Sequence, residues 1–152
     1  MYKYYYETPI GRICIEEKDN CITNLGISRG EKEVEEKETE LIKKTYEQLM
    51  EYFKGQRKTF DIPLKPQGTV FQMKVWKELL NIPYGETCTY KDIATRLGNP
   101  KACRAVGGAN NKNPIMIIIP CHRVVGKNGD LVGYACGLDV KSKLLEIERK
   151  NI

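Results

Sequence analysis

The residue types best suited to chemistry meet at one dipeptide, where a cysteine is followed directly by the only histidine of the chain. Cys121-His122 ends a run of apolar residues that is bounded by two prolines. A thiolate is a strong nucleophile, and an imidazole is a common base for generating it. A lone cysteine is just as often an inert, packed core residue. The dipeptide by itself therefore leaves both interpretations open.

The apolar run predicts how this cysteine is held. Branched residues over Ile115–Ile119 are typical of a fully buried extended segment. Pro120 ends the segment, because proline lacks an N–H and fixes its own φ. We therefore expect Cys121 at the floor of a pocket, where a buried strand reaches a turn.

A carboxylate is predicted to approach the same place from the last helix. Leu144 and Leu145 define the apolar face of a helix expected over Asp139–Lys150, and Glu148 shares that face. A carboxylate on an inward-facing stripe is rarely unpaired. Its partner is either a buried lysine or arginine, or His122.

Two short helices ahead of the apolar run predict a helix-turn-helix. The first is expected over Thr89–Leu97, with Thr89 as its N-cap. The second is expected over Pro100–Ala109, with Gly98 ending the first helix and Asn99 capping the second. The tight turn between them is typical of this motif.

The second of these helices is nearly bare of side chains apart from Arg104. Gly107 and Gly108 in its middle cost roughly 1 kcal/mol each relative to alanine. Such a helix either packs closely against another helix or lets a ligand approach its backbone. It has little with which to read base edges in a major groove. It could instead enter a minor groove, about 6 Å wide, with the arginine filling the space of a displaced base.

Composition favours a small intracellular protein. The 152 residues suit one domain or two small ones, and the net charge of +5 permits a polyanionic partner. Six cysteines without a C-x-x-C pair indicate reduced thiols and no zinc site. The chain has neither a membrane-spanning run nor a signal peptide. We therefore expect a cytoplasmic protein that does not associate with membranes.

The order of patterns predicts an α+β fold in two domains. Strands are expected over Tyr2–Tyr6, Arg12–Glu17 and Cys21–Ile27, followed by a charged connection over Gly30–Glu40 and one covering helix. A proline-rich linker separates this β-rich part, residues 1–66, from a mostly helical part, residues 67–152. The helical part begins with a helix expected over Val70–Asn81 and contains the helix-turn-helix.

Taken together, these motifs resemble the methylated-DNA–protein-cysteine methyltransferases, also called O6-alkylguanine-DNA alkyltransferases. The resemblance rests on Pro120-Cys121-His122-Arg123-Val124, on Gly98–Ala109, on Asn113-Pro114 and on the pattern from Gly133 to Glu148. It covers essentially the whole second domain. The first domain is similar to the family's ribonuclease-H-like domain in length and strand order.

The resemblance implies a DNA-repair activity in which the protein itself is consumed. Cys121 would take the alkyl group from O6-alkylguanine irreversibly, once per molecule, with O4-alkylthymine as a further candidate substrate. His122 would be the base and Glu148 would orient it. A water bridging Cys121 and His122 is expected, since neighbours in an extended chain point to opposite sides. Tyr90 matches the family's proton donor to the leaving guanine, and Asn113 its hinge asparagine.

The same resemblance implies that the target nucleotide is flipped out of double-stranded DNA and that the protein binds from the minor groove. The residues predicted to contact DNA are Tyr90, Lys91, Asn99, Ala102, Cys103, Arg104, Ala105, Gly107 and Lys127. Those predicted to line the pocket for the base are Pro120, Cys121, Val124, Tyr134, Ala135 and Cys136. Cys103 and Cys136 stand where smaller residues are commoner in the family, and Cys136 would disfavour bulky alkyl groups. No cofactor or metal is expected, and the protein is expected to be a monomer.

Three other functions fit parts of this pattern. A non-catalytic relative that only recognises alkylated bases would lack the acceptor thiol, so Cys121 counts against it. A helix-turn-helix regulator would need a recognition helix with more side chains. A cysteine hydrolase would turn over repeatedly and would not need DNA.

Overall fold

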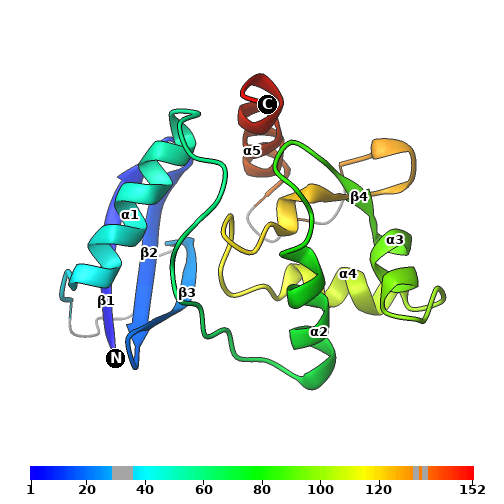
Figure 1. The fold of residues 1–152 in the computed structure, drawn as a ribbon, viewed down its shortest axis with the longest axis horizontal. Helices are drawn as coiled ribbons and strands as arrows, with labels where there is room; N and C mark the ends of the chain where they lie inside the picture. Colours follow the sequence, from blue (N-terminus) through cyan, green and yellow to red (C-terminus); the bar gives the residue numbers. More distant parts are fainter. Residues whose placement is uncertain (29–35, 132–133, 135–136) are drawn as a thin grey trace. The chain divides into compact units, whose positions relative to one another are not determined.

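The structure, a computed structural model, describes residues 1–28, 36–131, 134 and 137–152 (Figure 1). The chain divides into two compact units, Met1–Gln67 and Gly68–Ile152. Most of the charged connection expected over Gly30–Glu40 lies outside the described residues.

The first unit is an antiparallel sheet with one helix. Its strands are β1 (Tyr2–Thr8), β2 (Gly11–Lys18) and β3 (Cys21–Ile27), in the order β1-β2-β3. The tight β2–β3 turn places two consecutive residues, Asp19 and Asn20, at positive φ, as a two-residue hairpin requires. Helix α1 (Glu40–Phe53) contacts all three strands, and its Ile42, Leu49 and Tyr52 side chains are fully buried.

The second unit is mostly helical. Its elements are α2 (Val70–Leu79), β4 (Cys88–Thr89), α3 (Tyr90–Arg96), α4 (Cys103–Asn111), the 3-10 helix η1 (Cys121–Arg123), β5 (Val124–Val125), the 3-10 helix η2 (Lys127–Gly129) and α5 (Leu138–Lys150). Helices α2 and α4 are joined by a buried hydrogen bond in which the Trp76 indole N–H donates to the Ala109 carbonyl at 2.8 Å. Of the predicted helices, α5 begins one residue early and α2 ends two residues early.

The predicted helix-turn-helix is formed by α3 and α4, although the second helix begins later than expected. Thr89 and Asp92 form a capping box at the start of α3. Gly98 follows α3 at φ +82°. Asn99 does not cap α4, whose N-cap residue is Ala102. The Asn99 N–H instead donates to the Ala94 carbonyl and completes the Schellman motif that ends α3. Helix α4 therefore starts only at Cys103, without a side-chain cap.

The apolar run before Cys121 is buried as predicted, but it is not an extended strand. Residues 116–118 form a turn in which Ile117 has φ +69°. The Asn113 side chain closes this turn: its Nδ2 donates to the Ile119 carbonyl at 2.8 Å, and its Oδ1 accepts from the Ile115 N–H at 3.0 Å. These two bonds satisfy backbone groups that a strand would have paired with a neighbouring strand.

A short parallel pair of strands, β4 and β5, was not predicted. Cys88 pairs with Val124, and Thr89 pairs with Val125. The pair fixes the start of α3 beside the residues that directly follow Cys121-His122-Arg123. It therefore connects the helix-turn-helix to the cysteine.

Candidate active site

Cys121 lies in a tight turn that we call the cysteine turn (residues 119–124). It is the first residue of η1 and is 4% exposed. Its N–H donates to the Ile119 carbonyl at 2.7 Å, so the chain folds back sharply around Pro120. Because Cys121 and His122 lie in a 3-10 turn, the expectation of an extended chain at this dipeptide was wrong.

Buried side chains from two helices hold the cysteine turn at its carbonyl groups. Asn110, near the end of α4, directs its Nδ2 to the Cys121 carbonyl at 3.4 Å. Lys141 of α5 is fully buried and donates from Nζ to the Val124 carbonyl at 2.6 Å. With Asn113 on Ile119, three polar side chains fix the backbone on both sides of the sulfur.

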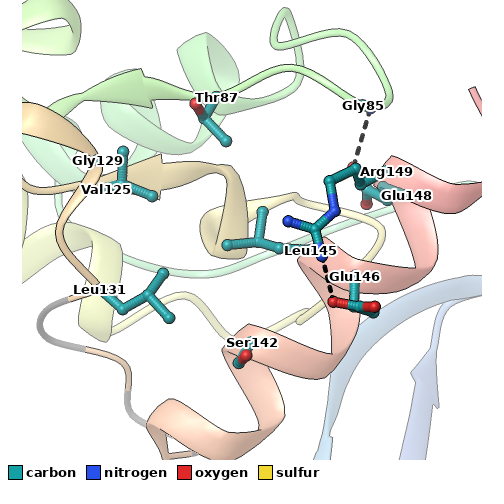
Figure 2. A pocket seen from close by; sticks show the side chains of 10 residues that line it. All are labelled: Gly85, Thr87, Val125, Gly129, Leu131, Ser142, Leu145, Glu146, Glu148 and Arg149. Atoms are coloured by element: carbon teal, nitrogen blue, oxygen red, sulfur yellow. Dashed lines mark hydrogen bonds and ion pairs between the residues drawn. The ribbon is translucent and has the colours of Figure 1, made fainter.

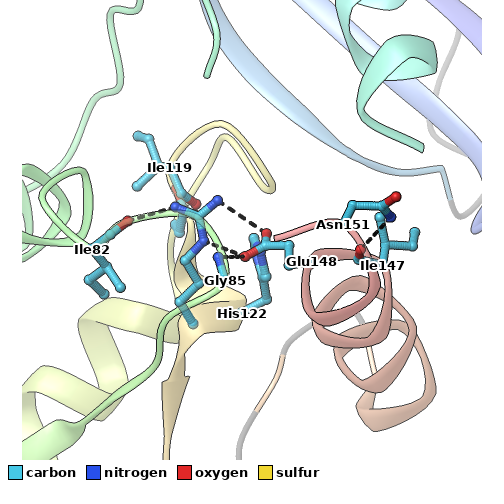
Figure 3. A network of polar contacts seen from close by, with 9 residues as sticks. Ile82, Gly85, Ile119, His122, Ile147, Glu148 and Asn151 are labelled. Carbon is cyan, nitrogen blue, oxygen red and sulfur yellow. Dashed lines mark hydrogen bonds and ion pairs between the residues drawn. The ribbon is translucent and has the colours of Figure 1, made fainter. Parts of the chain in front are cut away.

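Glu148 of α5 is the centre of a buried polar network (Figure 3). His122 and Glu148 are 0% and 1% exposed, and Nε2 of the imidazole lies 2.5 Å from Oε2 of the carboxylate. Arg123 binds the same carboxylate with two nitrogens, Nε at 2.8 Å and Nη2 at 3.1 Å. The Gly85 N–H also donates to Oε1, at 3.1 Å. The helical spacing predicted that Glu148 would pair either with a buried lysine or arginine or with His122, and in the structure it pairs with both Arg123 and His122.

The protonation states in this network follow from its geometry. Burial opposes ionisation of Glu148, but its hydrogen bonds with His122 and Arg123 and the positive charge of Arg123 outweigh it and hold the carboxyl pKa at about 2. Burial is the main cause that lowers the pKa of His122, and Arg123 and Lys141 lower it further against the opposing effect of Glu148. The imidazole is thus neutral at physiological pH. With Nε2 directed at Glu148, Nδ1 is the nitrogen that can accept a proton.

Two further side chains lie within electrostatic range of Cys121. Burial lowers the pKa of Lys141, while a negative charge on Cys121 would raise it. Burial raises the pKa of Tyr90, and a negative charge on Cys121 would raise it further, so the phenol remains protonated. An ammonium group and a phenol, one from α5 and one from α3, therefore lie near the sulfur.

A cavity of about 340 Å³ adjoins Tyr90. Its lining residues are Thr89, Tyr90, Lys91, Cys103 and Lys127. Four of these were predicted to contact DNA, and the fold brings them together from α3, α4 and η2. Lys91 and Lys127 are exposed and contribute positive charge at its edge.

The outer face of α4 is as bare as the sequence indicated. Arg104 and Ala105 are exposed. A Cβ added at Gly108 would meet no atom within 4 Å, and one added at Gly107 would meet only the Tyr90 ring, at 3.8 Å. Packing within the described part of the protein therefore does not require glycine at either position.

The other predicted residues are distributed as follows. Asn99 is exposed in the α3–α4 turn and does not line the cavity, while Ala102 is half-buried. Pro120 and Val124 are buried beside the cysteine, and Tyr134 is half-buried, with its ring centroid 5.8 Å from Lys141 Nζ. Ala135 and Cys136 lie outside the described residues.

A second cavity, of about 380 Å³, lies between α5 and the segments around β4 and β5 (Figure 2). Its lining residues are Gly85, Thr87, Val125, Gly129, Leu131, Ser142, Leu145, Glu146, Glu148 and Arg149. Glu148 is the one predicted site residue that lines it, among those that the structure describes. This cavity therefore adjoins the polar network rather than the thiol.

Arg123 and Lys141 were given no role from the sequence. Lys141 precedes Leu144 by three residues and Glu148 by seven, so the helical spacing already placed it on the inward face of α5. No comparable signal existed for Arg123, whose contact with Glu148 spans 25 residues.

Two searches of the described residues gave no candidates. No group of three or more His, Cys, Asp or Glu side chains there could hold a metal ion. No helix in the same part of the chain is long and apolar enough to cross a membrane.

Both units match models of one protein family. Residues 70–150 match the model described as "6-O-methylguanine DNA methyltransferase, DNA binding domain", and residues 1–66 the model described as "6-O-methylguanine DNA methyltransferase, ribonuclease-like domain". The methylated-DNA–protein-cysteine methyltransferase of Methanosarcina acetivorans is 48% identical over 153 residues, which cover 97% of this chain and 98% of that protein. The constitutive enzyme of that name from Bacillus subtilis is 48% identical over 152 residues, 94% and 92% of the two chains.

Solved structures agree with these matches. OGT of Mycobacterium tuberculosis in complex with DNA superposes with a TM-score of 0.92 at 41% identity, covering 99% of this chain and 94% of that one. An O6-methylguanine DNA methyltransferase from Methanococcus jannaschii gives a TM-score of 0.74 at 32% identity, with 97% and 94% coverage. The predicted fold, a small antiparallel sheet of ribonuclease-like type followed by a helical DNA-binding part, is thereby confirmed. The chain belongs to the methylated-DNA–protein-cysteine methyltransferase family.

Proposed function

We propose that this protein repairs DNA by transferring the alkyl group of O6-alkylguanine to Cys121, once per protein molecule. The observation that carries the proposal is the cysteine turn. It holds Cys121 directly before His122, whose neutral imidazole is bonded through Nε2 to the Glu148 carboxylate. Family membership supports the same reaction.

The step that follows is a single displacement at carbon. His122 Nδ1 takes the thiol proton of Cys121, directly or through a water molecule. The thiolate attacks the alkyl carbon, so that an S–C bond forms while the C–O6 bond breaks and its electron pair remains on the guanine. Tyr90, which burial keeps protonated, donates a proton to the leaving base and recovers one from the imidazolium through solvent. The products are a thioether at Cys121 and an unmodified guanine.

We propose that α4 binds the minor groove while the target nucleotide is flipped out, at a cost of a few kcal/mol. The open space over Gly108 and the exposed Arg104 support this, because a bare helix can approach the groove closely and the arginine can fill the gap. Lys91 and Lys127 are assigned to phosphate contacts. The remaining proposed contacts are Tyr90, Asn99, Ala102, Cys103, Ala105 and Gly107.

We propose that the protein acts as a monomer, in the cytoplasm and without a cofactor. None of the five cysteines that the structure describes forms a disulfide, which suits a reducing compartment. Pro120, Cys121, Val124 and Tyr134 are the described residues that we assign to the base pocket.

Intact-protein mass spectrometry tests the proposal. The protein is mixed with a duplex that carries one O6-methylguanine, and we expect a mass gain of one methyl group per molecule, with no further turnover. Cys121→Ala should abolish the gain. Cys14→Ala, which replaces a cysteine of the first unit that forms no disulfide, should leave it unchanged. Binding without mass gain would favour a non-catalytic relative or a regulator, and repeated turnover would favour a hydrolase.

A further inference from the structure

The Glu148 carboxylate receives more hydrogen bonds than a partner for His122 alone would need. Its two oxygens accept from His122, from Gly85 and twice from Arg123. The third nitrogen of the guanidinium, Nη1, donates to the Ile82 carbonyl at 2.6 Å. Arg123 is thus fixed at all its nitrogens and holds the carboxylate in a planar, bidentate pair.

The balance of charges around His122 differs from that in a simple histidine–carboxylate pair. An uncompensated buried carboxylate stabilises imidazolium and makes histidine charge more easily. Here the negative charge of Glu148 is already matched by Arg123 at 2.8 Å. A base that is already protonated cannot take the proton of a thiol.

Of the other groups in this network, Lys141 acts on His122 in the same direction as Arg123, and Tyr84 is neutral. Lys141, also from α5, adds a second positive charge. Tyr84, from the segment before β4, packs with its ring centroid 5.7 Å from the Arg123 guanidinium carbon, and burial keeps it a neutral phenol. The groups that face the imidazole therefore carry two positive charges against one negative charge.

We propose that Arg123 keeps His122 neutral and oriented as the base for Cys121, by compensating and immobilising the Glu148 carboxylate. Arg123 is then a positioning residue of the alkyl transfer, which acts through Glu148 and His122 without contacting the substrate. The inference deepens the proposed function and rests on it. It explains why the arginine directly follows Cys121-His122, since one short turn then delivers both the base and its charge control.

The lone histidine of the chain makes a direct test possible. Every histidine signal in an NMR titration of the free protein belongs to His122. We expect wild-type protein to titrate below the ordinary histidine value of 6.5. A wild-type midpoint at or above that value would overturn the inference without any variant.

Three variants separate charge from packing. In Arg123→Met the histidine midpoint should move to higher pH, whereas in Arg123→Lys, which retains the charge, it should stay close to that of the wild type. In Glu148→Gln, which removes the carboxylate, the histidine midpoint should move to lower pH. An unchanged midpoint in folded Arg123→Met would contradict the proposal, and so would a midpoint in Arg123→Lys that rises as far as that of Arg123→Met. If Arg123→Met does not fold, Arg123→Gln, which also removes the charge, takes its place with the same expected rise.

Single-turnover alkyl transfer gives the second readout. On the acidic side of the pH profile, Arg123→Met should lose about tenfold in rate for each unit by which the histidine midpoint rises. At high pH its rate should approach that of the wild type. A loss of equal size at every pH would mean a structural role only, and would overturn the inference. If the wild-type protein transfers no methyl group, the proposed function is wrong. The NMR titration would still show whether Arg123 controls the charge of His122.

Discussion

Among single residues, Tyr90 offers the clearest way to distinguish DNA binding from the alkyl-transfer step. It is the first residue of α3, lines the cavity that also contains Lys91 and Lys127, and lies within electrostatic range of Cys121. Because burial keeps its hydroxyl protonated, this residue can supply the proton that the departing guanine needs. Its ring also packs near Gly107 of α4.

Replacing Tyr90 by phenylalanine should remove the proton donor and keep the ring. We expect transfer to slow by roughly 10²-fold, the lower end of general acid contributions, with duplex affinity little changed. Single-turnover kinetics and a binding titration measure the two effects. Tyr46→Phe, in the first unit, is the matched control and should transfer at the wild-type rate. An unchanged rate in Tyr90→Phe would remove the tyrosine from the mechanism.

At the scale of elements, α4 is a helix whose composition is costly for its own stability. Gly107 and Gly108 lower its helix propensity, yet neither glycine is needed to avoid a clash within the described protein. The proposed approach of α4 to DNA would account for this cost, because a helix without side chains on its outer face can lie close to a groove.

Substitutions at Gly108 should therefore have opposite effects on stability and binding. Gly108→Ala should raise the free energy of unfolding by about 0.5–1 kcal/mol. Gly108→Leu should fold but lose most of its affinity for duplex DNA, because the side chain would occupy the space needed by the groove. Thermal unfolding and a DNA titration at fixed salt test both. Undiminished binding by Gly108→Leu would exclude this face of α4 as the DNA contact.

The segment between α4 and η1 depends on one amide. Asn113→Asp keeps the acceptor for Ile115 but loses the donor to Ile119. We expect a loss of about 1–3 kcal/mol in urea unfolding, because a carboxylate oxygen would then face the Ile119 carbonyl oxygen with no hydrogen between them, and that carbonyl would keep only the Cys121 N–H. Asn111→Asp, exposed at the end of α4, is the matched control and should cost far less. Equal losses in both variants would mean that the amide does not hold the turn.

At the scale of the whole molecule, the buried network links folding to pH. In the unfolded chain His122 takes up a proton near pH 6.5 and Glu148 near pH 4.5, whereas in the folded protein both do so at lower pH. The unfolded state thus binds more protons below these values, and stability must fall as the pH falls. The loss begins below about 6.5 with the histidine and continues from 4.5 toward 2 with the carboxylate.

Urea unfolding measured from pH 7 downward should show this decline in two stages. Glu148→Gln should have a shallower slope below pH 4.5, because its side chain cannot take up a proton. Glu47→Gln, exposed on α1, should keep the wild-type slope. Parallel slopes in all three proteins would show that Glu148 is not the source of the acid sensitivity.

The sequence by itself determined the elements and their order. Periods of two and of 3.6 residues located the strands of the first unit and the four helices of the second, and the Thr89 capping box and Gly98 marked the limits of α3 correctly. These signals are local, so a single chain carries them. The inward position of Glu148 could be predicted for the same reason, since it depends only on helical spacing.

Only the tertiary structure decided how the cysteine is held. The run Ile115–Ile119 reads as a strand by composition, but the Asn113 side chain closes it into a turn. The β4–β5 pair is two residues long and joins segments 36 residues apart, so it leaves no periodic signal. Asn99 was assigned to the wrong helix, because two adjacent helix ends competed for one residue. The pairing of Arg123 with Glu148, like that of Lys141 with Val124, depends on distances between elements, and those are set by packing rather than by any local pattern.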